Sequence, residues 1–247
     1  MDDRIIYRKK SDCLPDLPEK YYRRVLLDME DDQAELYNSM VSELYAELDN
    51  GAELWAPGVL ALLTRLRQIN LDPRTVGGSQ SSSKTEFIKD LVKNGPNKLV
   101  IFSTFEQYVR ILSKELDEMK VGHITLSGKT PTDQIRPMVD RFQEDPFCRV
   151  AVGTIKVMGQ GLTLHAASDV VLADRWWTPA ANNQAVDRLH RPGQKNAVQV
   201  LLLTNDKSID ATLDEILERK KGESELLLND SSVIQEVLED LRRVGKV

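Results

Sequence analysis

Apolar and amphipathic segments alternate along the chain after residue 84. Short runs that are continuously apolar predict buried strands, and they fall at residues 98–102, 123–126, 149–152, 170–173 and 198–203. Between these runs, apolar residues recur at helical spacing and predict helices at residues 84–94, 109–116, 131–144 and 179–191. Such alternation is typical of an α/β fold with a parallel sheet that helices cover on both faces.

The chain before residue 84 has a different pattern, which predicts a helical protrusion. Residues 24–29 have a strand-like pattern, and Asp32 with Glu35 then forms a capping-box arrangement at the start of a helix. The apolar stripe of that helix repeats every fourth residue, at Leu36, Met40, Leu44 and Leu48. Pro57 opens a second helix, and the glycine- and serine-rich residues 77–83 predict a flexible linker.

The two ends of the chain add a connector and further helices. Pro15 and Pro18 lie so close together that they favour an extended connector. Periodicity near the C-terminus predicts a helix at residues 208–220 and an acidic helix near 231–243. We therefore expect four parts, which are a connector (1–24), a helical protrusion with its linker (25–83), an α/β domain (84–205) and a helical C-terminal segment (206–247).

Composition narrows the class of protein. The chain of 247 residues is 41% hydrophobic and 29% charged, which is ordinary for a globular protein. No apolar run approaches the ~18 residues of a membrane span, so we expect no membrane partner. Cys13 and Cys148 lack paired spacing, and with only three histidines we expect neither a disulfide framework nor a metal site.

The net charge of −6 is unevenly distributed. Residues 25–64 contain nine acids and no base, so the rest of the chain has a net charge of +3. A mildly basic remainder is compatible with DNA on one side of the molecule. Charge therefore neither requires nor excludes a nucleic-acid partner.

The densest group of functional side chains lies at residues 184–194, which read Gln-Ala-Val-Asp-Arg-Leu-His-Arg-Pro-Gly-Gln. Gln184, Asp187, Arg188 and Arg191 are spaced i, i+3, i+4 and i+7, which predicts one face of a helix that Pro192 ends. Two planar guanidinium groups at a helix end suit the oxygens of a phosphate. Arginines beside an aspartate are more often a solvated face with a weak ion pair, and the spacing alone leaves both interpretations open.

This stretch resembles motif six of superfamily-two helicases, Gln-x-x-Gly-Arg-x-Gly-Arg. It is closer to the Swi/Snf-type variant, which ends in His-Arg-x-Gly-Gln and in which Asp187 and His190 stand at the two glycine positions. The resemblance implies that Gln184, Arg188 and Arg191 are catalytic residues acting on the γ-phosphate of ATP, and that Asp187 belongs to the ATP site.

Two loops that follow predicted strands resemble further motifs of this family. Ser103-Thr104 resembles motif four, Phe-Ser-x-Phe, although a helix N-cap would explain Ser103 equally well. Gly128-Lys129-Thr130 ends like a P-loop, but His123 stands where a P-loop needs glycine. In the family, Leu-x-Gly-Ser-Thr occupies this place and implies a DNA-phosphate contact from Lys129.

Residues 153–162 resemble motif five, Ala-Gly-Gly-x-Gly-Leu-Asn-Leu. Met158 and Thr163 depart from a glycine and an asparagine of the family, whereas Gly159 and Gly161 match and imply backbone contacts to ATP. Together these loops imply DNA-binding residues at Ser103, Thr104, Gly128, Lys129, Thr154 and Lys156.

Weaker similarities extend the resemblance over residues 5–220. Residues 174–179 resemble Asp-x-x-Trp-Asn-Pro, with Trp177 in place, and we expect Trp176 and Trp177 to be packing residues. Residues 66–73 are similar to Leu-Arg-x-x-Cys-x-His-Pro, but Asn70 to Asp72 depart from it. Residues 208–220 resemble a brace helix, and residues 14–20 resemble the segment that leaves the first motor lobe.

The resemblance implies the second RecA-like lobe of a Swi/Snf-type, ATP-driven translocase on double-stranded DNA. Neither a P-loop with its lysine nor a strand followed by Asp-Glu-x-His occurs, and Asp214-Glu215-Ile216 lies in a predicted helix. ATP and Mg²⁺ would then be bound mainly by a first RecA-like lobe absent from this chain. The isolated chain would be inactive.

The implied partners are double-stranded DNA and that first lobe, in a monomer. We expect the protein in the cytoplasm of a bacterial or phage-infected cell, or in the nucleus if the protein is eukaryotic. Two alternatives remain, namely a lobe of an unwinding DNA or RNA helicase, and a non-catalytic interaction module that kept the fold.

Overall fold

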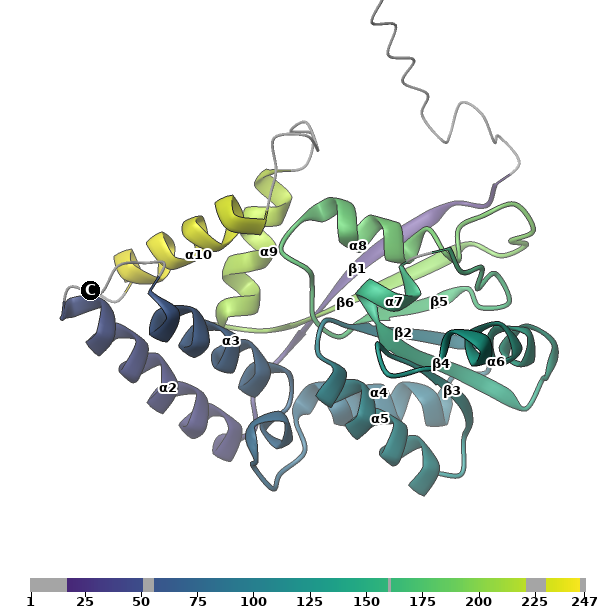
Figure 1. The fold of residues 1–247 in the computed structure, drawn as a ribbon, viewed down its shortest axis with the longest axis horizontal. Coiled ribbons are helices and arrows are strands. Elements are labelled where there is room, and N and C mark those ends of the chain that lie inside the picture. Colours follow the sequence, from purple (N-terminus) through teal and green to yellow (C-terminus); the bar gives the residue numbers. More distant parts are fainter. Residues whose placement is uncertain (1–16, 51–55, 160, 221–229, 245–247) are drawn as a thin grey trace, which may run out of the picture.

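The computed structural model describes residues 17–50, 56–159, 161–220 and 230–244 (Figure 1). In this part of the chain, six strands form one parallel sheet in the order β1-β6-β5-β2-β4-β3. The strands are β1 (Lys20–Leu27), β2 (Leu99–Ser103), β3 (Gly122–Leu126), β4 (Cys148–Thr154), β5 (Asp169–Leu172) and β6 (Val198–Asn205). The sheet confirms the predicted α/β class.

Helices cover both faces of this sheet, as its continuously apolar strands predicted. On one face, α4 (Ser83–Asn94) and α5 (Glu106–Glu118) bury Tyr108 against strand residues such as Ile101. On the other, α6 (Thr132–Glu144), α7 (Ile155–Met158) and α8 (Pro179–Val186) bury Phe142 against strand residues such as Phe102. Neighbouring residues of β2 thus face different cores, because strand side chains alternate in direction.

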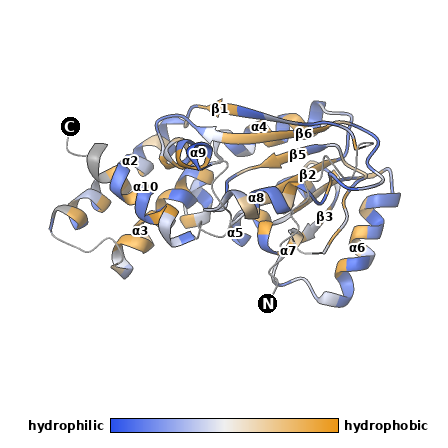
Figure 2. Ribbon diagram, turned by 90° about the horizontal axis from the view of Figure 1, so that it is seen from above, coloured by the Kyte–Doolittle hydropathy of each residue, from blue (hydrophilic) through white to orange (hydrophobic). Residues whose placement is uncertain are grey.

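Four helices from the two ends of the chain form a second body beside the sheet (Figures 1 and 2). They are α2 (Asp31–Asp49), α3 (Pro57–Leu71), α9 (Ile209–Arg219) and α10 (Asp230–Val244), and we call them the helical unit. Leu44 and Leu48 of the predicted stripe are buried there together with Ile216 and Val237. The predicted protrusion and C-terminal segment therefore share one core.

The sheet begins earlier than the sequence suggested. β1 starts at Lys20, so residues 20–24 of the expected connector pair with β6, where Lys20 lies opposite Val198. β1 stands at the edge of the sheet, and Tyr21, Tyr22 and Leu26 are exposed on it. No side chain of β1 is fully buried, and for that reason the strand lacks the continuous apolar run that marks the inner strands.

The start of α2 differs from the predicted capping box. The helix begins at Asp31 after Glu30, and no side chain of the capping residue closes it. Asp32 instead accepts a hydrogen bond from Gln80 Nε2 at 2.6 Å. The side chain that was expected to cap the helix is thus used in a contact between distant segments.

Residues 77–82 lead into α4 and form hydrogen bonds with neighbouring segments, and the flexibility expected from their composition stays a prediction. Gly77 follows the short 3₁₀ helix η1 (Pro73–Val76) with a φ of +95°, a left-handed conformation that favours glycine. The hydroxyl of Ser82 is buried, donates to Leu71 O at 2.8 Å and accepts from the amide of Thr85 at the start of α4. Glycine and serine here satisfy two helix ends, and composition cannot distinguish that role from flexibility.

Among the helices of the described ranges, none combines the length and the apolar character needed to cross a bilayer.

Candidate functional site

The predicted site residues lie in two separate regions of the sheet. The first region, which we call the carboxyl edge, follows the ends of β2, β3 and β4 and contains Ser103, Thr104, Gly128, Lys129, Thr154 and Lys156. The second region is α8 together with the residues that follow it, and we call residues 187–194 the arginine turn. This turn lies near the start of β1 and β5, because His190 Nε2 is 2.6 Å from Pro18 O and Gln194 Nε2 donates to Ala167 O at 2.8 Å.

Asp174 organises the carboxyl edge at the end of β2. Its Oδ1 accepts hydrogen bonds from the hydroxyl of Ser103 at 2.6 Å and from the amide of Thr104 at 3.0 Å, and its Oδ2 accepts from the Thr104 hydroxyl. Ser103 is fully buried and its oxygen also accepts from the amide of Phe105, but it is not the N-cap of α5, because that position is Phe105 and no side chain caps the helix. Thr104 is half-buried, and its backbone is fixed at the edge.

Arg67 connects this edge to the helical unit. Its guanidinium lies 3.4 Å from Asp174 Oδ2, donates to Arg175 O and stacks at 4.1 Å from the ring centroid of Trp177. Burial lowers the pKa of Arg67, and the Asp174 carboxylate opposes that shift. A buried charge needs such a partner to be tolerated, so α3 and the loop after β5 are held together.

Two more buried ion pairs fix the same junction. Lys84 Nζ donates to Ala173 O at 2.9 Å and pairs with Asp210 at the start of α9. Arg175 pairs with Asp214 of α9 at 2.6 Å. Burial raises the pKa of Asp214, while the Arg175 charge and a hydrogen bond from Thr204 lower it. The helical unit thus meets the sheet through charges removed from solvent.

The remaining residues of the carboxyl edge differ in accessibility. Gly128 and Lys129 are exposed, and Lys129 Nζ forms an ion pair with Glu106 at 3.2 Å. Lys156 is exposed on α7, whereas Thr154 is buried at the end of β4. Lys129 and Lys156 are therefore the two cations of this set that can meet a phosphate.

The predicted helix over residues 179–191 ends five residues early, at Val186. The amides of Arg188 and Leu189 bond to carbonyls three residues back, which tightens the chain into turns. The carbonyl of Arg188 instead accepts from the amide of Leu164 at 2.9 Å, a contact that helical bonding would not supply. Gln184 thus lies on α8, whereas Arg188 and Arg191 lie on the arginine turn.

Backbone carbonyls hold Arg191 in place. Its Nε donates to Asp187 O at 3.2 Å and its Nη1 to Leu162 O at 3.3 Å, so it bridges the arginine turn and the glycine-containing loop after α7. Gln194 is buried and donates to Ala167 O, while its own oxygen accepts from the amides of Lys195 and Asn196. The turn is therefore fixed on both sides of Arg191.

The two arginines of the turn form no ion pair with any carboxylate of the described residues. Burial lowers the pKa of Arg188, the nearby Arg191 lowers it further, and Asp187 opposes the shift. Arg188 Nε is buried and has no hydrogen-bond partner in the described part of the chain. Arginine stays charged under these conditions, so an anion placed here would relieve the repulsion and complete the missing hydrogen bond.

A hollow of about 220 Å³ lies between α7 and α8. It is lined by Ile155, Lys156, Gly159, Trp176, Ala181 and Gln184. Three predicted residues, Lys156, Gly159 and Gln184, therefore face one space, although they come from two elements. A Cβ at Gly159 would lie 2.4 Å from Ile155 O, and Gly161 has a φ of +69°. Both positions therefore require glycine for backbone reasons.

Sequence reasoning missed three residues that shape the site, namely Asn182, Asp174 and Lys20. Asn182 Nδ2 donates to Trp176 O and Thr178 O, each at 2.9 Å, and its oxygen accepts from Trp176 N. Trp176 Nε1 in turn donates to Asp230 at 3.0 Å, and Trp177 packs with the helical unit, as packing residues should. Two adjacent asparagines at the start of a helix were the one available signal for Asn182.

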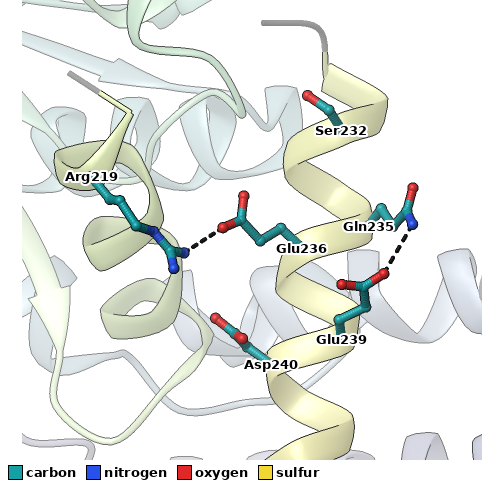
Figure 3. A pocket seen from close by; sticks show the side chains of 6 residues that line it. All are labelled: Arg219, Ser232, Gln235, Glu236, Glu239 and Asp240. Atoms are coloured by element: carbon teal, nitrogen blue, oxygen red, sulfur yellow. Dashed lines mark hydrogen bonds and ion pairs between the residues drawn. The ribbon is translucent and has the colours of Figure 1, made fainter. Parts of the chain in front are cut away.

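A second hollow lies between α9 and α10 and contains no predicted site residue. Arg219, Ser232, Gln235, Glu236, Glu239 and Asp240 line it (Figure 3). Arg219 and Lys220 both pair with Glu236, at 2.5 and 3.1 Å, so these charges stabilise the contact of the two helices. Across residues 17–50, 56–159, 161–220 and 230–244, no three His, Cys, Asp or Glu side chains gather to hold a metal ion.

Comparison with known proteins agrees with this architecture. Residues 83–193 match the family described as helicase conserved C-terminal domain. The mouse protein "DNA annealing helicase and endonuclease ZRANB3" is 30% identical over 241 residues, which are 97% of this chain and 22% of that protein. The "Putative ATP-dependent helicase/translocase YwqA" of Bacillus subtilis is 25% identical over 93% of this chain and 26% of that protein. The chain thus spans a minor part of the length of these relatives.

Solved structures share the fold over nearly the whole chain. The Sulfolobus solfataricus SWI2/SNF2 ATPase core in complex with dsDNA superposes with a TM-score of 0.76 and 27% identity, covering 94% of this chain and 51% of that one. The C-terminal domain of the Sulfolobus solfataricus SWI2/SNF2 ATPase gives a TM-score of 0.73 at 24% identity and covers 92% of this chain and 98% of that one. The sheet and its helices therefore have the RecA-like arrangement of such C-terminal lobes.

Proposed function

The chain belongs to the SWI2/SNF2-type helicases, as a C-terminal lobe with a helicase conserved C-terminal domain, and from that premise we propose that it is the second motor lobe of an ATP-dependent translocase on double-stranded DNA. Relatives named as ATP-dependent helicases support the use of ATP. The SWI2/SNF2 core solved with double-stranded DNA supports a duplex as the partner.

One observation carries the proposal. Arg188 and Arg191 lie close together on a fixed turn, and neither has a carboxylate partner among the described residues. Three other buried or half-buried arginines, Arg67, Arg74 and Arg175, are each paired with an aspartate. Two neighbouring cations, of which Arg191 is held by backbone carbonyls, suit an anion that another body brings to them, and the γ-phosphate of ATP has that charge.

In this proposal Arg191 and Arg188 are arginine fingers and Gln184 assists them. Phosphoryl transfer depends mainly on positioning and on stabilising the charge of the transferred group, and an arginine finger can contribute ~10³–10⁵ in rate. Gly159 and Gly161 would let the backbone approach the nucleotide, and Asp187 would border it. The orphaned Nε of Arg188 fits a phosphate oxygen.

We assign ATP and Mg²⁺ mainly to a first RecA-like lobe that precedes this one. A nucleotide site needs a P-loop and an acidic motif for Mg²⁺, and the sequence of this chain contains neither. Mg²⁺ would neutralise charge on the phosphates. The residues of this lobe would orient the γ-phosphate from the opposite side of the cleft, in a monomer with both lobes.

The carboxyl edge would contact DNA. Lys129 and Lys156 are exposed there, and the Thr104 backbone is fixed beside them by Asp174. Translocation requires contacts to phosphates and no reading of bases. Closure of the two lobes on ATP, followed by opening after hydrolysis, would move this edge along the backbone of the duplex.

Substitution of Arg191 by lysine in the two-lobed protein tests the assignment. Arg191→Lys keeps the positive charge but loses the planar fork that spans two oxygens as charge develops. We expect most DNA-stimulated ATP turnover to be lost through kcat, with a smaller change in KM and nearly unchanged DNA affinity.

Arg136→Lys, at an exposed arginine of α6, is the matched control and should retain full turnover. A parallel Arg188→Lys variant ranks the two arginines. If Arg191→Lys turns over ATP within a few fold of the parent, Arg191 is not a finger and the turn has a structural role.

A further inference from the structure

The start of β1 is bound to α8 and the arginine turn by three hydrogen bonds. Tyr22 hydroxyl donates to Asn183 Oδ1 at 3.3 Å, Lys20 Nζ donates to Asp187 Oδ1 at 2.9 Å, and His190 Nε2 is 2.6 Å from Pro18 O. Figure 1 shows α8 beside β1. The segment 18–22, more than 160 residues away in sequence, therefore contacts both α8 and the arginine turn that follows it.

The geometry of this contact is regular. Lys20 and Tyr22 are two residues apart on a strand, so their side chains leave it on the same side. Asn183 and Asp187 are four residues apart, so they lie one turn above each other on α8 and its end. The amide of Val198 also donates to Glu19 O at 2.9 Å. The segment 18–22 is thereby fixed between β6 and the arginine turn.

Asp187 links Lys20 to both arginines. Its backbone carbonyl accepts the hydrogen bond from Arg191 Nε at 3.2 Å. Its carboxylate is near enough to Arg188 to oppose the lowering of that residue's pKa. Lys20 holds one oxygen of that carboxylate, and both partners are partly shielded from solvent, with side chains 22% and 36% exposed. The Asp187 carboxylate thus pairs with Lys20 and also acts on the charge of Arg188.

We propose that Lys20 is a positioning residue for the arginine turn. By holding the Asp187 carboxylate, it keeps this acid from neutralising Arg188 and fixes the backbone carbonyl that places Arg191. The inference rests on the proposed function of the two arginines as a γ-phosphate site. It adds that the start of β1 is part of this site.

If Lys20 and Asp187 formed an ordinary ion pair of an edge strand, the expected result would differ. Partly exposed pairs contribute little to stability, and their removal leaves catalysis untouched. The discriminating variant is Lys20→Met, which keeps the length of the side chain and removes its charge. Arg23→Met is the matched control, because Arg23 is an exposed cation of the same strand with no ion pair in the described residues.

The measurement is DNA-stimulated ATP turnover of the two-lobed protein at saturating duplex, with a thermal midpoint for every variant. We expect Lys20→Met to lower kcat about tenfold, since a misplacement of about 1 Å can cost up to ~10²-fold, with KM within about twofold. Lys20→Arg restores the pair and should recover most of the loss. Arg23→Met should match the parent, and the midpoints of the two methionine variants should agree.

Parallel measurement of Arg191→Lys separates the two levels of the argument. If Arg191→Lys loses turnover while Lys20→Met keeps the parent kcat, the positioning role is overturned and the finger assignment stands. If Arg191→Lys keeps turnover, the proposed function of the two arginines is wrong, whatever the result for Lys20→Met. The positioning role is also overturned if Lys20→Arg is as slow as Lys20→Met, or if the loss of kcat in Lys20→Met is matched by a fall in its thermal midpoint.

Discussion

Replacement of Lys84 by methionine should destabilise the protein far more than its position on a helix suggests. Lys84 is fully buried in the first turn of α4, where Nζ donates to Ala173 O at 2.9 Å and pairs with the Asp210 carboxylate. Methionine fills similar space but removes the charge and both hydrogen bonds. Asp210, 7% exposed, would be left as a buried carboxylate without its cation.

The magnitude follows from that unpaired charge. Removal of one partner of a buried ion pair costs ~3–5 kcal/mol, and the loss of the bond to Ala173 O is part of this cost. For a chain of this size, each kcal/mol lowers the thermal midpoint by ~2–4 °C, so we expect a decrease of ~6–20 °C. Lys93→Met, at an exposed lysine of the same helix, should change the free energy of unfolding by less than ~0.5 kcal/mol.

Thermal and denaturant unfolding of Lys84→Met, Lys93→Met and the double variant Lys84→Met/Asp210→Asn would test the reasoning. The double variant should recover at least half of the loss, because it removes the uncompensated charge as well as its partner. The argument is refuted if Lys84→Met is as stable as Lys93→Met. A double variant no more stable than Lys84→Met would show that packing, and not charge, causes the loss.

Three further results are expected. The purified chain alone should hydrolyse ATP no faster than buffer, with or without duplex DNA, and robust DNA-stimulated turnover would contradict the assignment of the nucleotide to a first lobe. Its binding to DNA should be weak, indifferent to sequence and salt-sensitive, and a plot of log binding constant against log salt concentration should have a slope of about −0.9 per phosphate neutralised. Lys129→Ala and Lys156→Ala should each reduce that slope by about one phosphate. Unchanged slopes would place the DNA site elsewhere. Burial raises the pKa of Glu115, but hydrogen bonds from Arg74 and Lys89 outweigh it and lower the pKa below its usual value. This pairing therefore stabilises the fold above the ordinary glutamate pKa of about 4.3, and the stabilisation is lost as pH falls through the pKa of the folded state. Glu115→Gln should have a lower free energy of unfolding than the parent at pH 7, and the two values should become equal in acid. A difference that is the same at all pH values would exclude this linkage.

Local patterns predicted the elements whose environment is uniform. The inner strands β2, β4, β5 and β6 are buried on both faces, and their continuous apolar runs revealed them within a few residues. The leucine stripe of α2 likewise marks a helix with one buried face. β1 was predicted only in part because none of its side chains is fully buried, with Tyr21 and Tyr22 exposed, so no long apolar run develops.

The candidate motif was located by sequence, but its shape was not. The spacing from Gln184 to Arg191 fits a helix face, yet α8 ends at Val186. In a helix, the carbonyl of Arg188 would need the amide of residue 192, and Pro192 has none. Leu164, distant in sequence, donates to that carbonyl, and the buried Gln194 fixes the following turn. A helical pattern does not show which distant segment supplies such a donor.

The ion pairs that join the two bodies lay beyond any single-sequence argument. In the sequence, Arg67 is one polar position of an apolar helix and Lys84 is an ordinary residue of a first helical turn. Their partners, Asp174 and Asp210, are 107 and 126 residues away in the chain. Whether such a charge is solvated or buried depends on which carboxylate the fold places within reach. The sequence by itself therefore determined the fold class, through its periodicity, and the candidate phosphate-binding residues, through the resemblance of residues 184–194 to a helicase motif, because both are local properties of the chain. The tertiary structure alone decided which charges are paired and that Arg188 and Arg191 lie without a carboxylate partner among the described residues, because burial and electrostatic pairing depend on distances between segments that are far apart in the chain.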